Sequence, residues 1–137
     1  MAYEWTPDLA TGMNDIDAQH RELLRRIGEL HRCMRAGETS SVPGVLVGIR
    51  EYVQTHFANE EREMREVGFP SAARHAAQHA RFTTELARFE KDWSRHGTTA
   101  SLTIDLAGWL SSWFRDHVRG YDAEFATFLR ARRSAAG

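Results

Sequence analysis

Seven histidines stand out in this chain of 137 residues, and several recur at the spacing of one helical turn. His75 and His79 lie four residues apart, so a helix would place both imidazoles on one face, one turn apart. His56 and Glu60 repeat this spacing earlier in the chain. Two such side chains can ligate one metal ion, although an isolated pair of this kind also arises by chance. The pairs therefore raise a metal-site hypothesis that needs support from the rest of the chain.

The apolar stripes of the helical segments supply that support. Apolar residues recur there at three- and four-residue steps, and ionisable residues interrupt the same stripes. A buried stripe holds ionisable groups only where something compensates their charge. The residues concerned are His20, His31, His56, Glu60, His75, His79, His117 and Asp122.

Four segments carry this periodicity and must position these side chains. They run from about residue 15 to 36, 42 to 67, 72 to 96, and 101 past 128, and no segment alternates with a strand's period of two. Links of about five residues make successive helices antiparallel neighbours. We therefore expect an all-α, up-down-up-down antiparallel four-helix bundle. Residues 1–137 would form one domain, with 1–13 as an N-terminal arm holding Trp5 and 130–137 as a flexible tail.

The antiparallel order brings the polar groups to one level of the bundle. His20 lies near the start of the first segment and His56 near the end of the second, while the later groups lie correspondingly near the same end. His31 lies three turns from His20 and so away from this level, and the five imidazoles and two carboxylates that remain are too many for one tetrahedral zinc ion. They suit two six-coordinate ions of iron or manganese, with bridging carboxylates and one free position. The ExxH pairs of ferritin-like di-iron proteins do not occur in this chain.

Composition excludes several other classes of protein. Lys and Arg number 18 against 19 Asp and Glu, which argues against a nucleic-acid-binding module. No apolar run reaches the length of a membrane span, and residues 1–12 do not resemble a signal peptide. Cys33 is the single cysteine, so neither an internal disulfide nor a cysteine-based zinc cage can form. We expect a soluble, cytoplasmic protein with no membrane or nucleic-acid partner.

The chain resembles the hemerythrin family, in its short bacterial form, over nearly its whole length. The similarity lies in a set of short motifs that occur in the family's order and at its spacing. These motifs are Trp5, Thr11-Gly12-Met13, Ile16-Asp17-Ala18-Gln19-His20, residues 52–61 from Tyr52 to Glu61, Gly68-Phe69-Pro70, His75-Ala76-Ala77-Gln78-His79, and residues 113–118 from Trp113 to Val118, followed by Asp122.

The resemblance implies two irons with different ligands. His75, His79 and His117 would bind the first iron, and His20 and His56 the second. Glu60 and Asp122 would bridge them together with an oxo or hydroxo group. The second iron would keep an open position, where the family binds dioxygen reversibly. Apolar residues adjacent to these ligands, or one turn away, would line the dioxygen pocket: Leu23, Phe57, Trp113, Phe114 and Val118.

Two of these pocket residues depart from the family pattern. Phe114 stands where the family usually has Leu, and Val118 stands where it usually has Ile. We expect the larger Phe114 ring to narrow the entry of dioxygen or to change the rate at which the iron oxidises, whereas metal ligation does not depend on it.

Other polar residues have simpler interpretations. We expect His31 to be a core or half-exposed histidine, because it lies three turns from His20, and His96 to be a cation near a helix end. Gln19 and Glu61 are expected at the surface, and Cys33 without a role. Asp17 belongs to the first turn, where it could also contact a ligand imidazole.

Three functions are compatible with such a centre. The first is a dioxygen-binding protein for carriage, storage or delivery, without substrate turnover. The second is an oxygen- or redox-sensing domain of a signalling system, whose protein partner the sequence does not identify. The third is a peroxidase-like or nitric-oxide-handling protein. We rank it last because the apolar stripes carry no additional acid or base.

Overall fold

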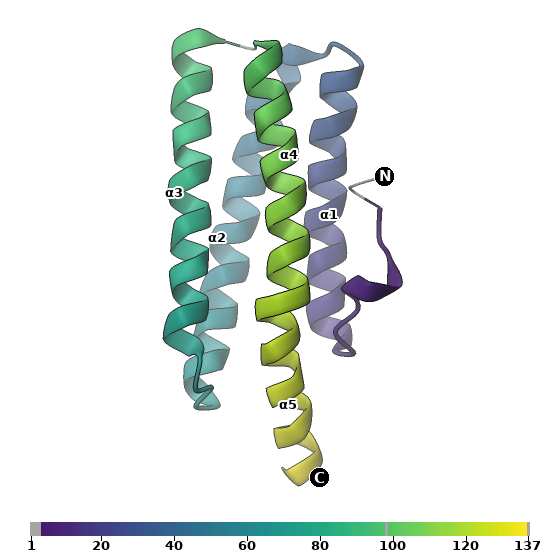
Figure 1. The fold of residues 1–137 in the computed structure, drawn as a ribbon, viewed down its shortest axis with the longest axis vertical. Coiled ribbons are helices and arrows are strands. Elements are labelled where there is room, and N and C mark those ends of the chain that lie inside the picture. Colours follow the sequence, from purple (N-terminus) through teal and green to yellow (C-terminus); the bar gives the residue numbers. More distant parts are fainter. Residues whose placement is uncertain (1–3, 98, 137) are drawn as a thin grey trace.

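The computed structural model describes residues 4–97 and 99–136, and within these ranges it is helical (Figure 1). The predicted all-α bundle with up-down-up-down order is confirmed. None of the helices described is long and apolar enough to cross a membrane. The elements in chain order are η1 (Pro7–Leu9), α1 (Asn14–Arg35), η2 (Thr39–Ser41), α2 (Val42–Glu66), α3 (Ala72–His96), α4 (Ala100–His117), η3 (Val118–Asp122) and α5 (Ala123–Ala136).

Glycines in the left-handed conformation end the first two long helices. Gly37 follows α1 with φ of 72°, and Gly68 follows α2 with φ of 68°. The next residue then bonds back into each helix, from Glu38 N–H to Cys33 C=O and from Phe69 N–H to Met64 C=O, both at 2.9 Å. This pattern satisfies free carbonyl groups at the helix ends and favours glycine, which has no Cβ to clash. The chain can therefore reverse within a few residues, which makes α1, α2 and α3 antiparallel neighbours.

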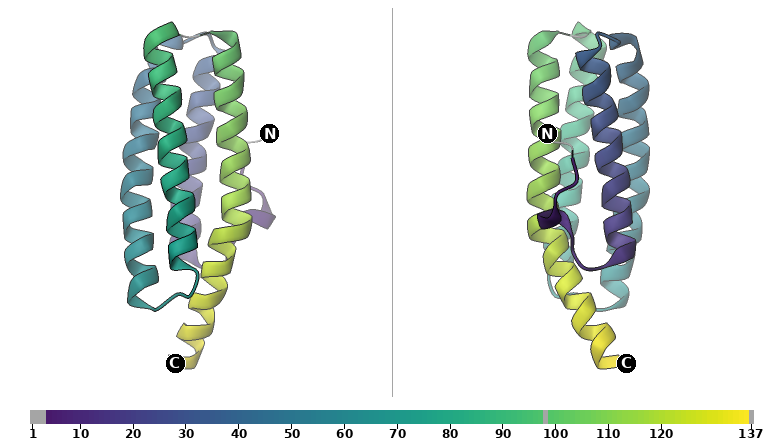
Figure 2. Two further views of the ribbon diagram at one scale, coloured as in Figure 1. Left: turned by 60° about the vertical axis from the view of Figure 1, so that its left-hand side comes forward. Right: turned by 90° about the vertical axis from the view of Figure 1, so that its right-hand side faces the viewer.

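The N-terminal arm lies along the bundle beside α1 and α4 (Figure 2, right). Leu9 in its short η1 turn is fully buried, and the Arg21 guanidinium lies 4.5 Å from the centre of the Trp5 ring. Asp17 of α1 accepts hydrogen bonds from the Thr11 backbone N–H at 2.9 Å and from its hydroxyl at 2.7 Å. A buried carboxylate therefore fixes the arm where it enters α1. Residues 1–3, also expected in the arm, lie outside the described residues.

The fourth helical rod is longer than the other three. α4, η3 and α5 follow one another without a break, and α5 extends beyond the link between α2 and α3 (Figures 1 and 2). Residues 130–136, where the sequence suggests a flexible tail, belong to α5, while Gly137 lies outside the described residues. Arg130 donates to the Thr11 carbonyl at 2.5 Å, and Arg133 lies 3.4 Å from Glu63. α5 thus contacts both the arm and α2.

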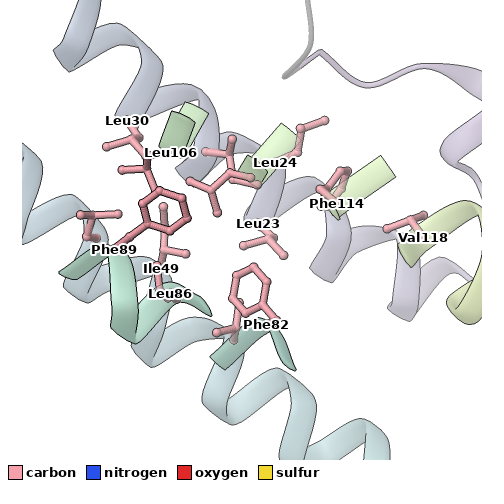
Figure 3. Packing of buried hydrophobic residues seen from close by; sticks show 14 of the residues in the cluster. Leu23, Leu24, Leu30, Ile49, Phe82, Leu86, Phe89, Leu106, Phe114 and Val118 are labelled. Carbon is pink, nitrogen blue, oxygen red and sulfur yellow. The ribbon is translucent and has the colours of Figure 1, made fainter. Parts of the chain in front are cut away.

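Two apolar clusters fill the interior, and the ionisable residues separate them. The larger cluster contains Leu23, Phe82, Phe114 and Val118 with other aliphatic and aromatic residues of α1 to α4 and η3 (Figure 3). The smaller cluster lies at the opposite end of the bundle. Its buried members are Met13, Ile16, Met64, Phe69, Phe125, Ala126 and Leu129. Burial of both clusters is the main favourable term in folding, and it holds four helices around the polar layer between them.

Candidate metal centre

Seven ionisable side chains from every long element meet in this polar layer. None is more than 7% exposed, and the fully enclosed Asp122 is 1% exposed. α1 contributes one imidazole, α2 an imidazole and a carboxylate one turn apart, α3 two imidazoles one turn apart, and α4 with η3 an imidazole and a carboxylate. In that order they are His20, His56, Glu60, His75, His79, His117 and Asp122. The structure thus brings together every ligand candidate from the sequence.

The π-helical segment η3 brings Asp122 round to the same side as His117. An α-helix turns about 100° per residue, so a residue five positions further on would point about 140° away. In η3 the Ala123 N–H bonds instead to the Val118 carbonyl, five residues back, which widens the turn. As a result Asp122 Oδ1 lies 3.2 Å from His117 Nε2. The insertion of a wide turn at this point is what makes the pair usable as ligands of one centre.

Three imidazoles form one side of the centre, which we call the three-imidazole group (His75, His79 and His117). Their Nε2 atoms converge, with 3.2 Å from His75 to His117 and 3.2 Å from His79 to His117. Glu60 Oε1 lies 2.8 Å from His75 Nε2 and 3.4 Å from His79 Nε2. Asp122 Oδ1 lies 3.0 Å from His75 Nε2. These five donors form one compact set that can hold a metal ion.

The remaining two imidazoles form the other side, which we call the two-imidazole group (His20 and His56). Here the opposite oxygens of the same carboxylates face the imidazoles. Asp122 Oδ2 lies 2.8 Å from His20 Nε2, and Glu60 Oε2 lies 3.5 Å from His56 Nε2. Each carboxylate therefore directs one oxygen to each group, which is the arrangement of a carboxylate that bridges two metal ions.

Several of these buried atoms satisfy no hydrogen bond within the protein. His20 Nε2, Glu60 Oε1 and Asp122 Oδ1 have short neighbours but none at a hydrogen-bonding angle. Buried polar atoms are normally paired, because an unpaired one costs about 1–3 kcal/mol. The Nε2 lone pairs of neutral imidazoles repel one another at such distances. The close approach of these atoms in His75, His79 and His117 therefore also requires a proton or a cation between them. Imidazole and carboxylate are the donors that iron accepts, so the residues fit an iron centre.

The electrostatics of the layer are dominated by the two buried carboxylates. Burial lowers the pKa of His75, but the adjacent carboxylates of Asp122 and Glu60 outweigh burial and raise that pKa to about 9. Burial alone would raise the pKa of Asp122, yet the neighbouring His117 and His20 hold it well below its ordinary value. The layer thus stabilises positive charge, which a bound cation supplies.

Burial has the opposite outcome at two other imidazoles. It lowers the pKa of His56 and of His117 below the ordinary value, and the nearby carboxylates only partly oppose it. Burial therefore favours the neutral form of both side chains, which is the form that ligates metals.

Two imidazoles also bond outward, through Nδ1, to residues that the sequence placed on the surface. His56 Nδ1 lies 2.5 Å from Gln19 Oε1, and His79 Nδ1 lies 3.0 Å from Glu61 Oε2. Sequence reasoning missed both contacts, although Gln19 and Glu61 each directly adjoin a ligand candidate. By contrast, Asp17 bonds to Thr11 of the arm, as described above.

The predicted pocket residues divide between the two sides of the centre. Phe57 stacks on His79 at 3.9 Å between ring centres, and Trp113 stacks on His117 at 4.4 Å. Phe114 instead presents its ring to His20 edge-on, at 6.2 Å. Leu23 and Val118 are 3% and 2% exposed and pack in the same cluster as Phe114 (Figure 3). Trp113 thus lies against the three-imidazole group and Phe114 against the two-imidazole group, whereas Phe57, whose ring centre also lies 5.9 Å from that of His56, contacts both groups.

The remaining histidines do not join the centre. His31 is half-buried, and its Nε2 lies 3.3 Å from the Ser111 hydroxyl. His96 is exposed in the last turn of α3. Cys33 is buried as a free thiol. The Tyr121 ring packs parallel to the His117 ring at 5.5 Å between ring centres. The aromatic residues four positions before and four positions after His117 therefore both stack on it.

Comparisons with known proteins agree with this geometry. The model of the hemerythrin HHE cation binding domain matches residues 11–129. The chain is 31% identical to the bacteriohemerythrin of Stenotrophomonas maltophilia, over 93% of this chain and 81% of that protein. It is 27% identical to the bacteriohemerythrin of Methylococcus capsulatus, over 93% and 96%, and 20% identical to the myohemerythrin of Riftia pachyptila, over 90% of each. A hemerythrin domain binds two iron ions, and the buried histidine and carboxylate cluster is suited to them. This chain therefore belongs to the hemerythrin family.

Proposed function

We propose that this chain binds dioxygen reversibly at a di-iron centre, for carriage, storage or delivery, and does not turn over a substrate. The observation that carries the proposal is the division of each carboxylate between the two imidazole groups. We assign His75, His79 and His117 to one iron and His20 and His56 to the other. Glu60 and Asp122 bridge the two, together with an oxo or hydroxo group.

The count of donors supports one open position. His75, His79 and His117 with one oxygen of each carboxylate would hold one iron, and a bridging oxygen would complete its six ligands. His20 and His56 with the other two carboxylate oxygens and the same bridge would hold the second iron, which would leave one position for dioxygen. When bound, the iron pair supplies the electrons that hold dioxygen and recovers them on release.

The protein's own part is to fix the ligands and to exclude water from the open side. Phe114 packs against His20 of the two-imidazole group, and Leu23 and Val118 are buried in the same apolar cluster as Phe114. Apolar surroundings of low dielectric constant disfavour the entry of water and the separation of charge. Either would otherwise let the bound group leave as an anion, and the iron would then remain oxidised. Among the buried residues described, the ionisable side chains outside the ligand set are Asp17 and Cys33. Asp17 is bonded to Thr11, and Cys33 lies 13 residues beyond His20 on α1, about 20 Å along the helix axis. Neither therefore offers an acid or base at the open side, which favours binding over catalysis.

The test is metal analysis combined with absorption spectroscopy. Purified protein should contain about two irons per chain and little zinc. After anaerobic reduction, exposure to air should produce ligand-to-metal absorption bands, and removal of dioxygen should abolish them over repeated cycles. One zinc per chain, or bands that appear once and never reverse, would refute the proposal. We also propose that residues 1–137 form one domain and that the protein is cytoplasmic.

A further inference from the structure

The five imidazoles of the centre share one orientation. Each directs Nε2 toward a carboxylate oxygen of Glu60 or Asp122. With Nε2 facing inward as the ligand atom, the ring proton resides on Nδ1 and is available to an outer acceptor. His20, His75 and His117 have no hydrogen-bond partner at Nδ1 among the described residues, whereas His56 and His79 do. The outer contacts therefore single out two of the five.

These two outer acceptors differ in charge and serve different sides of the centre. Glu61 accepts from His79, which belongs to the three-imidazole group, at 3.0 Å. Gln19 accepts from His56, which belongs to the two-imidazole group, at 2.5 Å. A carboxylate acceptor draws the ring proton toward itself and makes the imidazole a stronger ligand, whereas an amide orients the ring without adding charge.

Aromatic rings pack against both of the imidazoles that bond outward. The Tyr52 hydroxyl donates to the Gln19 backbone carbonyl at 2.8 Å, and its ring lies parallel to His56, tilted by 8°. On the other side, the Phe57 ring stacks on His79 beside Glu61. Glu61 is 27% exposed and lines a surface cavity of about 270 Å³ together with Phe57 and His79. The two hydrogen bonds thus join imidazoles that are packed within the site to acceptors that reach the surface.

We propose that Glu61 and Gln19 are positioning residues that make the two metal positions unequal. Glu61 strengthens His79 as a ligand and so favours the ferric ion in the position of the three-imidazole group. Gln19 orients His56 without adding charge, so the metal position of the two-imidazole group gains no such preference for the ferric ion. The inference rests on the proposed function, because it takes the imidazoles as iron ligands.

The experiment exchanges the charge of each acceptor while keeping its shape. Glu61→Gln removes the carboxylate from His79, and Gln19→Glu adds one at His56. Glu51→Gln is the matched control, since Glu51 is an exposed residue ten positions earlier on the same helix, about 15 Å along its axis. Each purified protein is analysed for iron content, for the rate of iron release to a chelator, and for reduction potential by spectroelectrochemical titration.

We expect Glu61→Gln to fold, to load two irons, to release one of them roughly tenfold faster, and to have a more positive reduction potential. Gln19→Glu should shift the potential in the negative direction. Glu51→Gln should match the original protein in every measurement. Mössbauer spectra of samples enriched in ⁵⁷Fe should show the two iron signals altered unequally, with different signals affected by the two substitutions.

The inference is overturned if Glu61→Gln and Gln19→Glu change release rate, potential and Mössbauer spectra no more than Glu51→Gln does. It is also overturned if both substitutions move the potential in the same direction. The failure of the proposed function gives a different result, because the original protein itself would then lack two irons or would keep its absorption bands when dioxygen is removed. If Glu61→Gln loads iron poorly, its melting temperature in the iron-free form separates loss of folding from loss of binding, and Gln19→Glu tests the predicted sign independently.

Discussion

Replacement of Phe114 by Leu tests how this chain controls access of dioxygen to the centre. Phe114 is fully buried, and its ring meets the His20 ring edge-on at 6.2 Å. Leu23 and Val118 pack in the same cluster, so the leucine side chain would leave space beside the open side of the two-imidazole group. None of the seven ligand candidates changes, and iron content should therefore be preserved.

The structural cost of this substitution follows from its burial. Loss of a methylene from a core costs about 0.5–1.5 kcal/mol and truncation of Phe to Ala about 3–5, so Phe114→Leu should cost about 1–2 kcal/mol of unfolding free energy. If the ring obstructs dioxygen by about 1 kcal/mol, its removal should raise the association and dissociation rates about fivefold. Oxidation of the iron in air should also accelerate, because the same space admits water.

Phe82→Leu is the matched control. Phe82 is also buried in the larger cluster, but its ring contacts Phe57, Trp109 and Trp113 rather than His20. Urea unfolding of both variants should give similar losses of stability. Stopped-flow mixing of the reduced proteins with dioxygen should give faster rates in Phe114→Leu alone.

The reasoning fails if Phe114→Leu leaves the association, dissociation and autoxidation rates unchanged. It also fails if Phe82→Leu accelerates them equally, because the effect would then come from general loosening of the core. In either case Phe114 fills the core and does not control access.

Three further predictions concern stability. Iron removal by a chelator at neutral pH should lower the melting temperature, because a metal that binds only the folded chain stabilises it; equal melting of both forms in calorimetry would contradict this. The iron-free chain should lose stability in urea titrations on both sides of neutral pH. In acid, the lowered pKa values of His56 and His117 mean that the unfolded chain takes up protons first. In alkali, the charged His75 stabilises the fold fully below about pH 6.5, and this contribution is lost as the pH rises through its raised pKa of about 9. A steady rise in stability from pH 5 to 10 would refute the assignment. Asp17→Ala removes the acceptor of two Thr11 hydrogen bonds and should cost about 1–3 kcal/mol, with faster proteolysis of the arm; unaltered cleavage would show that other contacts hold it.

The amino-acid sequence alone was sufficient to predict the bundle and to assemble the candidate ligands. Helical periodicity is a local property, and it placed His75 with His79 and His56 with Glu60 on shared faces. Short links then required antiparallel neighbours, and the distance of each pair from its helix end put all the groups at one level. Family motifs added the division of imidazoles between two irons. These steps depend on spacing along the chain, which the sequence states directly.

The role of η3 required the tertiary structure. On an ideal α-helix, Asp122 would point away from His117, so the spacing of five residues gives no shared face. The π turn at Val118–Asp122 corrects this and places Asp122 against His20 and His75.

The outer hydrogen bonds were also decided by the tertiary structure. Gln19 and His56 are 37 residues apart, and Glu61 and His79 are 18 apart, on helices whose relative rotation no sequence pattern specifies. The same holds for Asp17, whose partner Thr11 lies in an irregular arm, and for the packing of Trp113 against His117 and of Phe114 against His20. Periodicity shows which face of a helix is buried, but the contacts across that face depend on side-chain conformations and interhelical distances that only the packed bundle fixes.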